Sequence, residues 1–241
     1  MATTTIDASK QTYARSGTQT SWSAARDATS SLTHINYTTT QTNVPSAITE
    51  LYSSGRGGGA YVIERSFFFF DTSTINGTIT AIDLKIVGVT YTGNAVRVAK
   101  STAYGTSGGS AYANGDFDNW TNPSGAFPAA PTPYNASNYT WGALTNTIAL
   151  NATAISDANN DDYLNLALVG GTYDYPDTQP FVDVEDYSGI QFASSTTFPQ
   201  LAITYTPSAT GYGNDVNGID ADDIVEVNGI DTDDIVEVIG V

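Results

Sequence analysis

The sequence predicts an all-β protein: a jelly-roll-like β-sandwich followed by a short C-terminal β-repeat tail. Three observations lead to this fold class. Short segments rich in β-branched and aromatic residues recur along the chain, and polar turn residues separate them. Apolar residues almost nowhere follow the spacing of an amphipathic helix. With 241 residues, the chain is also long enough to bury a substantial core.

Strand patterns begin with residues 60–70, which follow a glycine-rich stretch and end in four consecutive phenylalanines. In residues 79–89, Ile82, Leu84 and Ile86 alternate with other side chains, as in a strand with one buried face. Further short strands are expected at residues 95–99, 145–150, 163–169, 189–192 and 200–205. Short strands at turn-rich spacing are typical of a sandwich or a jelly roll.

Only one segment favours a helix. A turn or two is expected over residues 46–51, with Ser46 as the N-cap. Residues 99–141 are rich in Gly, Pro, Asn and aromatic side chains, and they predict one or two long loops. A loop of this length in a compact domain is usually functional or packed as a cap.

The C-terminal end is built from repeats. Residues 216–226 (VNGIDADDIVE) recur as residues 227–237 (VNGIDTDDIVE), so the repeat has eleven residues and differs only at Ala221 and Thr232. A partial third copy starts at Val238, and residues 207–215 have the composition of a linker. The chain therefore divides into a jelly-roll sandwich (1–206), a linker (207–215) and an eleven-residue β-repeat tail for assembly (216–241).

The tail is expected to contact other subunits. The first repeat runs into Asn228 and Gly229, a pair that favours a tight hairpin turn. Such a unit cannot bury its apolar side alone, so we expect it to bind a second copy in a homo-oligomer, or other proteins of an assembly. The expected contact residues are Ile219, Ile224, Val225, Val227, Ile230, Ile235, Val236 and Val238.

The same repeats offer oxygen ligands for Ca²⁺, a hard cation. The spacing of Gly and Glu does not match an EF-hand loop, and solvated charged loops are the alternative interpretation, so no cofactor is certain. The candidate ligands are Asp220, Asp222, Asp223, Asp231, Asp233 and Asp234.

Charge excludes several classes of partner. The formal net charge is −17, and only 8 residues are Lys or Arg. Nucleic acid and anionic membrane surfaces both need clustered cations, so neither is expected as a partner. The N-terminal residues 1–7 lack the basic start and apolar run of a signal peptide, and no stretch has the length of a membrane span.

Catalytic signatures are also missing from the sequence. The chain has no cysteine and one histidine, His34, which excludes thiolate chemistry and a multi-histidine metal site. Acidic pairs such as Asp161 and Asp162 occur, and glycosidases use paired carboxylates, but solvated acidic loops account for most such pairs. We therefore expect a protein that is not an enzyme.

Aromatic residues on expected loops are candidates for sugar binding, because a ring can stack on a pyranose face. The alternative is that these rings pack as core or loop plugs. The candidate glycan-binding residues are Trp120, Tyr134, Tyr139, Trp141, Tyr173 and Tyr175.

Two segments carry a family resemblance. Residues 65–75 (RSFFFFDTSTI) lead into residues 78–84 (TITAIDL), and residues 198–205 read FPQLAITY. The pattern resembles the jelly-roll family called DNRLRE or carbohydrate-binding module 96-like, across about residues 5–206. The resemblance implies that Arg65 pairs with a carboxylate or caps carbonyl groups at the sandwich edge. It also implies that Phe68 and Phe70 share one face, the inner one, and that the final strand pairs beside an early strand and closes the domain. No sugar-contact motif of the family maps onto this chain.

The Phe-Asp-Thr-Ser-x-Ile segment combined with Val-Asn-Gly-Ile repeats is also similar to structural proteins of tailed phages, especially marine ones. This likeness implies a non-enzymatic virion protein, such as a capsid decoration, head fibre or tail-fibre component, that forms surface-exposed oligomers and contacts host glycans. It would reside on the virion surface, and in the host cytoplasm during assembly. The alternative is a secreted carbohydrate-binding or adhesin module.

Overall fold

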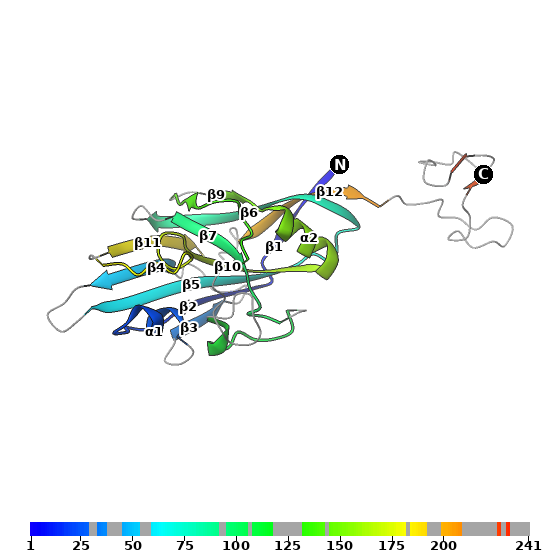
Figure 1. Ribbon diagram of the computed structural model, residues 1–241. Coiled ribbons are helices and arrows are strands. Elements are labelled where there is room, and N and C mark those ends of the chain that lie inside the picture. Colours follow the sequence, from blue (N-terminus) through cyan, green and yellow to red (C-terminus); the bar gives the residue numbers. More distant parts are fainter. Residues whose placement is uncertain are drawn as a thin grey trace.

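The computed structural model describes residues 1–28, 33–37, 45–53, 59–91, 95–105, 108–117, 132–142, 145–181, 184–191, 199–208, 226–227 and 230–231. Two antiparallel sheets pack face to face, so the predicted all-β sandwich is confirmed (Figure 1). Within the described part of the chain, no helix is long and apolar enough to cross a membrane.

The first sheet has four strands in the order β1, β12, β6 and β9. They are β1 (Ala2–Asp7), β12 (Gln200–Pro207), β6 (Gly77–Tyr91) and β9 (Thr145–Ala149). The last strand of the sandwich therefore pairs with the first, with Ala2 opposite Tyr205 and Asp7 opposite Gln200. This confirms the expectation that the C-terminal strand closes the domain beside an early strand.

The second sheet is built around β5 (Ala60–Asp71), which pairs with β2 (Lys10–Arg15), β4 (Pro45–Ser53) and β10 (Tyr163–Gly170). Beyond them lie β3 (Thr33–Tyr37), β11 (Val184–Gln191), β7 (Ala95–Lys100) and β8 (Tyr139–Thr140). The C-terminal end of β6 also pairs with β11, which joins the two sheets along one side.

Both faces of β5 are buried, which explains its run of apolar residues. Phe68 and Phe70 point into the inner core between the sheets, as the family resemblance implied. Phe67 and Phe69 point the other way, into an outer core on the far face of the second sheet. The protein thus has two apolar cores that share one strand.

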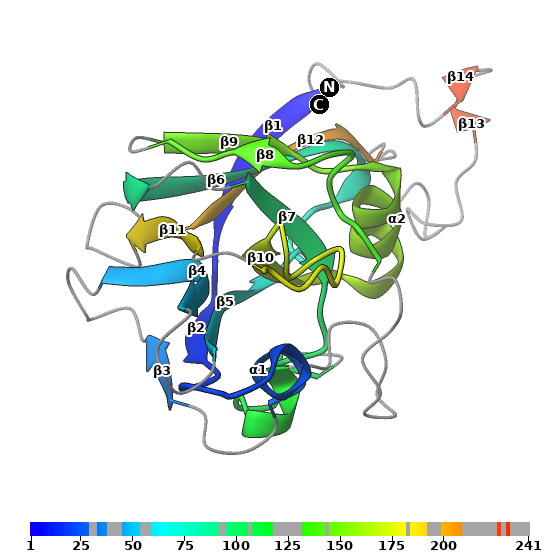
Figure 2. The ribbon, with the colours of Figure 1, turned by 60° about the vertical axis from the view of Figure 1, so that its left-hand side comes forward.

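Two short helices cover parts of these cores. Helix α1 (Trp22–Arg26) begins at Ser21, whose hydroxyl accepts a hydrogen bond from the Ala24 amide, and it covers the outer core. Helix α2 (Ala152–Asp161) begins at Asn151, contacts β6 and β10, and closes one end of the inner core (Figure 2). A single-turn 3-10 helix, η1 (Asn114–Phe117), also lies over the outer core.

The helix predicted over residues 46–51 is wrong, because this segment belongs to β4. Residues of β4 pair with β5 on one side and with β11 on the other, so ladder hydrogen bonds override the weak local helical signal. Six of the predicted strands are present within two residues of their expected ends. The strand predicted at residues 189–192 begins earlier, at Val184, and residue 192 lies outside the described residues.

The turn after β5 follows the sequence closely. The Asp71 carboxylate accepts hydrogen bonds from the Ser73 amide (3.0 Å) and the Ser73 hydroxyl (2.6 Å), which ends the strand. These bonds lower the pKa of Asp71 below its usual value, because they stabilise the ionised carboxylate.

In the tail, β13 (Glu226–Val227) and β14 (Ile230–Asp231) pair antiparallel, with Val227 opposite Ile230. This register agrees with the hairpin expected at residues 228–229. The two strands form a separate sheet, not an extension of the sandwich. The boundaries predicted at residues 206 and 215 stay predictions, since most of the chain after residue 208 lies outside the described residues.

Phe68 and Phe181 offer a matched test of the core. Phe68 is fully buried, whereas Phe181 is 82% exposed. Replacing Phe68 with alanine should lower the free energy of unfolding by about 3–5 kcal/mol, through lost burial and a residual cavity. Phe181→Ala should change it by less than about 0.5 kcal/mol. Chemical denaturation of the two variants measures both values, and equal losses would contradict the assignment of Phe68 to the core.

Candidate functional site

The most strongly constrained polar group lies in the outer core. Arg65 sits on β5 between two apolar neighbours on the same face and is fully buried. Its Nε and Nη2 donate to the two carboxylate oxygens of Asp174, at 2.8 and 2.7 Å, and its Nη1 donates to the Phe117 carbonyl at 2.6 Å. The guanidinium also stacks on the Phe117 ring, with Cζ 4.2 Å from the ring centroid. The expectation that Arg65 pairs with a carboxylate or caps carbonyl groups is confirmed, since it does both, but β5 lies inside the second sheet and not at the sandwich edge.

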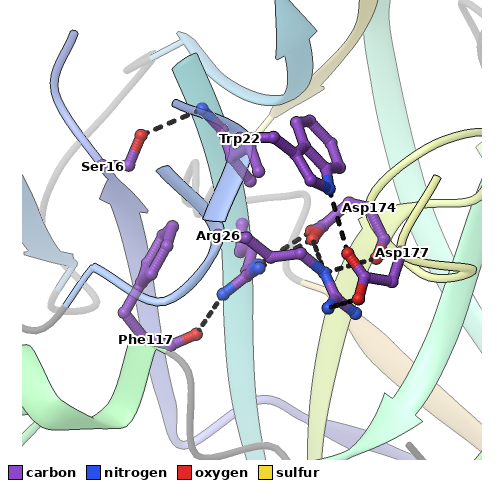
Figure 3. Close-up of polar contacts among 8 residues, drawn as sticks. Ser16, Trp22, Arg26, Phe117, Asp174 and Asp177 are labelled. Carbon is purple, nitrogen blue, oxygen red and sulfur yellow. Dashed lines mark hydrogen bonds and ion pairs between the residues drawn. The ribbon is translucent and has the colours of Figure 1, made fainter. Parts of the chain in front are cut away.

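A second arginine extends this network to helix α1 (Figure 3). The Nε of Arg26 donates to the Asp174 carbonyl at 3.0 Å, and its Nη1 pairs with the Asp177 carboxylate at 2.9 Å. Trp22 Nε1 donates to the other Asp177 oxygen at 3.0 Å. Asp177 adopts a left-handed backbone conformation, with φ of 54°, which directs its carboxylate toward the helix. The network therefore ties α1 to the loop over residues 171–178.

The chemistry of this cluster is that of a permanent ion-pair network. Burial lowers the pKa of Arg26, and the negative charge of Asp174 opposes that shift. Both guanidinium groups have carboxylate partners, and each partner is held by a second contact. The arrangement suits it to hold a loop in one conformation, and we assign it a structural role.

A smaller polar cluster joins α2 to the inner core. Asp157 accepts hydrogen bonds from the Tyr134 hydroxyl at 2.7 Å and from Lys100 Nζ at 2.9 Å. Burial raises the pKa of the Tyr134 phenol, and the neighbouring Asp157 carboxylate raises it further. Tyr134 thus acts as a buried hydrogen-bond donor.

The structure separates the six aromatic glycan-binding candidates. Trp120 lies outside the described residues. Tyr134 and Trp141 are 1% and 2% exposed and pack in the inner core, so both are wrong as sugar-contact residues: a buried ring has no free face to offer.

The three remaining rings are half-buried, and they lie on two sides of the second sheet. Tyr139 packs against the inner core, whereas Tyr173 and Tyr175 pack against the outer core. Only the last two share a loop, and that loop is the one held by the Arg65–Asp174 pair. The structure therefore brings together two of the six predicted residues.

Arg97 is the residue beside this pair that sequence reasoning missed. Its guanidinium lies over the Tyr175 ring, 4.7 Å from the centroid, and the side chain is largely buried. In the described part of the chain, no carboxylate forms an ion pair with Arg97, and its buried Nε has no hydrogen-bond acceptor. The one signal in the sequence is a charged residue placed between Val96 and Val98, on the opposite face of a buried strand.

A polar depression also crosses the outer face of the first sheet. It is lined by Thr3, Thr5, Asp83, Lys85, Ala202 and Thr204, among others. None of its lining residues is aromatic, so it lacks the stacking surface that the sugar-binding prediction needs.

Most of the tail candidates lie outside the described residues. Among the predicted contact residues the structure describes only Val227 and Ile230, both in the β13–β14 pair, and among the calcium candidates only Asp231. Across the described ranges, no group of three or more acidic or histidine side chains is placed to hold a metal ion. The calcium and subunit-contact predictions for the tail stay predictions.

Comparison with known proteins adds no relative. No protein-family model matches the chain, and no curated protein sequence is similar to it.

Asp174 should be essential for folding stability. Asp174→Asn would leave the fully buried Arg65 without its counter-charge, which should cost about 3–5 kcal/mol of unfolding free energy. Asp177→Asn is the matched control, because the Asp177 side chain is 56% exposed and its pair with Arg26 should contribute about 1 kcal/mol or less. Urea unfolding compares the two. Equal losses of unfolding free energy would show that the buried pair of Arg65 and Asp174 contributes no more to stability than the exposed pair of Arg26 and Asp177.

Proposed function

We propose that this protein is a non-enzymatic structural component of a tailed-phage particle, displayed on the virion surface as an oligomer. The observation that carries the proposal is the organisation of the C-terminal end. Strand β12 pairs with β1 and completes the sandwich, and the repeats follow as a separate two-stranded sheet. The Phe-Asp-Thr-Ser-x-Ile segment and the Val-Asn-Gly-Ile repeats are similar to segments of phage structural proteins, which supports the same role.

A hairpin of this size needs a partner. Two paired strands alone are marginally stable in water, because they bury too little apolar surface. The tail repeats place Ile and Val beside Asp and Glu, so each strand has apolar side chains to bury and no core of its own. Docking on a second copy, or on another virion protein, would supply the missing surface.

Deleting residues 214–241 should separate folding from assembly. The truncated protein should keep its thermal unfolding transition, because every strand of the sandwich remains. It should no longer sediment with purified particles assembled in its presence. Unchanged incorporation of the truncated protein would contradict the proposal.

Substitutions within the repeats refine that experiment. Val227→Ser combined with Ile230→Ser removes apolar groups from the β13–β14 pair and should reduce incorporation at least tenfold. Asp222→Asn combined with Asp223→Asn is the matched control, and it should leave incorporation unchanged unless bound Ca²⁺ organises the tail. If the native chain is incorporated only when Ca²⁺ is added, and the Asp222→Asn, Asp223→Asn variant does not respond to Ca²⁺, the acidic residues have a metal-binding role.

Glycan contact is a second candidate function, as part of a virion protein or of a secreted binding module. The observation that favours it is the loop carrying Tyr173 and Tyr175, whose half-exposed rings are held in place by the buried ion pairs. A rigid aromatic surface binds with little loss of conformational entropy.

Binding of the purified protein to host surface glycans tests this candidate. Tyr173→Ala combined with Tyr175→Ala should weaken binding at least tenfold on a glycan array, because stacking contacts are lost. Phe181→Ala is the control, since it removes an exposed ring outside the predicted set. Equal binding by all three proteins would exclude this loop as the contact surface. Detection of the protein in particles, with no free secreted form, would favour the virion role over the secreted one.

A further inference from the structure

Strand β1 forms an open edge of the first sheet. It pairs with β12 along its whole length, and no strand in the described part of the chain pairs with its other side. Natural proteins usually protect such an edge with Lys, Pro, a bulge or a covering segment. Residues 2–6 of β1 (ATTTI) contain neither Lys nor Pro, and their register with β12 is regular.

The register shows which backbone groups face outward. Just beyond β1, the Ala8 amide donates to the Pro199 carbonyl, whereas the Ser9 amide points the other way and donates to Phe69. Because hydrogen-bonding direction alternates along an antiparallel strand, even-numbered residues of β1 bond to β12. The N–H and C=O groups of Thr3 and Thr5 therefore point away from the sheet and are available to a further strand.

The side chains of the same two residues are exposed. Thr3 and Thr5 lie on the outer face of the sheet, whereas Thr4 and Ile6 are half-buried on the inner face. Residues 2–6 of β1 carry no charged side chain. A strand added here must therefore place apolar or β-branched residues on the inner face and uncharged residues on the outer face. The tail repeats would bring carboxylates to this edge, with no partner on β1 to neutralise them.

We infer that β1 binds β1 of a second copy of this chain, antiparallel and centred on Thr4, so that the first sheets of two sandwiches form one continuous sheet. A two-fold axis through Thr4 places Thr3 opposite Thr5 of the second copy, and Ala2 opposite Ile6. Each Thr3–Thr5 pair then exchanges both of its outward backbone hydrogen bonds. Odd-numbered residues face odd-numbered residues of the second copy, and even-numbered residues face even-numbered ones. The inner faces of the two sheets therefore lie on the same side of the continuous sheet.

This pairing also matches side chains well. Threonine opposite threonine is a favourable cross-strand pair, through both the methyl and the hydroxyl groups. The interface uses none of the tail residues, so it is independent of the proposed virion role and would also serve a secreted module.

Cysteine cross-linking of the full chain tests the inference, because the native sequence has no cysteine. At the two-fold axis Thr4 faces its own copy in a pair without mutual hydrogen bonds, where α-carbons lie about 4.5 Å apart, within the range of a disulfide. Thr4→Cys should therefore form a covalent dimer under mild oxidation, visible on a non-reducing gel. Thr147→Cys is the control. Thr147 is exposed on β9, at the other edge of the same sheet, and this variant should stay monomeric.

Charges introduced at Thr3 and Thr5 check the register in the Thr4→Cys background. Thr3→Lys with Thr5→Lys would place lysines opposite one another and should reduce the cross-linked fraction at least fivefold. Thr3→Lys with Thr5→Glu would place Lys opposite Glu and should preserve cross-linking. Both substituted positions, Thr3 and Thr5, are exposed, so thermal unfolding should confirm that the sandwich remains folded. Cross-linking of Thr4→Cys no greater than that of Thr147→Cys, or weaker than that of Thr5→Cys, would overturn the inference.

Discussion

The buried pair of Arg65 and Asp174 is the interaction on which the outer half of the structure depends. A guanidinium on the outer face of β5 cannot stay charged in an apolar environment unless a carboxylate and further acceptors surround it. Asp174 and the Phe117 carbonyl meet that need from two different segments. Both segments must therefore fold back over the second sheet, and in doing so they build the outer core.

The two sheets differ in how their faces are covered. In the second sheet, both faces of β5 are covered, and its phenylalanines alternate between two cores. In the first sheet, β1, β6, β9 and β12 alternate between buried and more exposed residues, so one face packs inward and the other remains polar. In the described part of the chain, the polar face of the first sheet and the edge of β1 are thus exposed, while the loop of Tyr173 and Tyr175 is held in place on the opposite side, over the second sheet.

Sequence patterns predict the sandwich because its central strands, such as β5, β6 and β10, are rich in apolar residues, whereas the polar strands β1 and β2 give no such signal. The patterns fail where long-range pairing decides the structure. The segment of β4 has a helical start signal, yet two neighbouring strands hold it extended. Helix α2 is rich in Asn, Asp and Thr, residues with low helix propensity, and it forms because Asn151 caps it and Ala154 and Ala158 pack inward.

The candidate site shows the same division. A charged residue within an apolar strand indicates that Arg65 needs a partner, but Asp174 lies 109 residues away and nothing local identifies it. The buried aromatic residues Tyr134 and Trp141 have the same loop composition around them as the half-exposed Tyr173 and Tyr175, so only the packing separates them.

What the fold leaves incomplete is as informative as what it completes. A regular edge strand with no charged side chain in residues 2–6, and a two-stranded tail sheet, each present backbone and apolar groups that isolated chains satisfy poorly. The edge strand β1 pairs with β12, the last strand of the sandwich, and the tail sheet follows β12 in the chain. Attachment through the proposed β1 edge would leave the loop of Tyr173 and Tyr175, across the second sheet, free to face outward from an assembly.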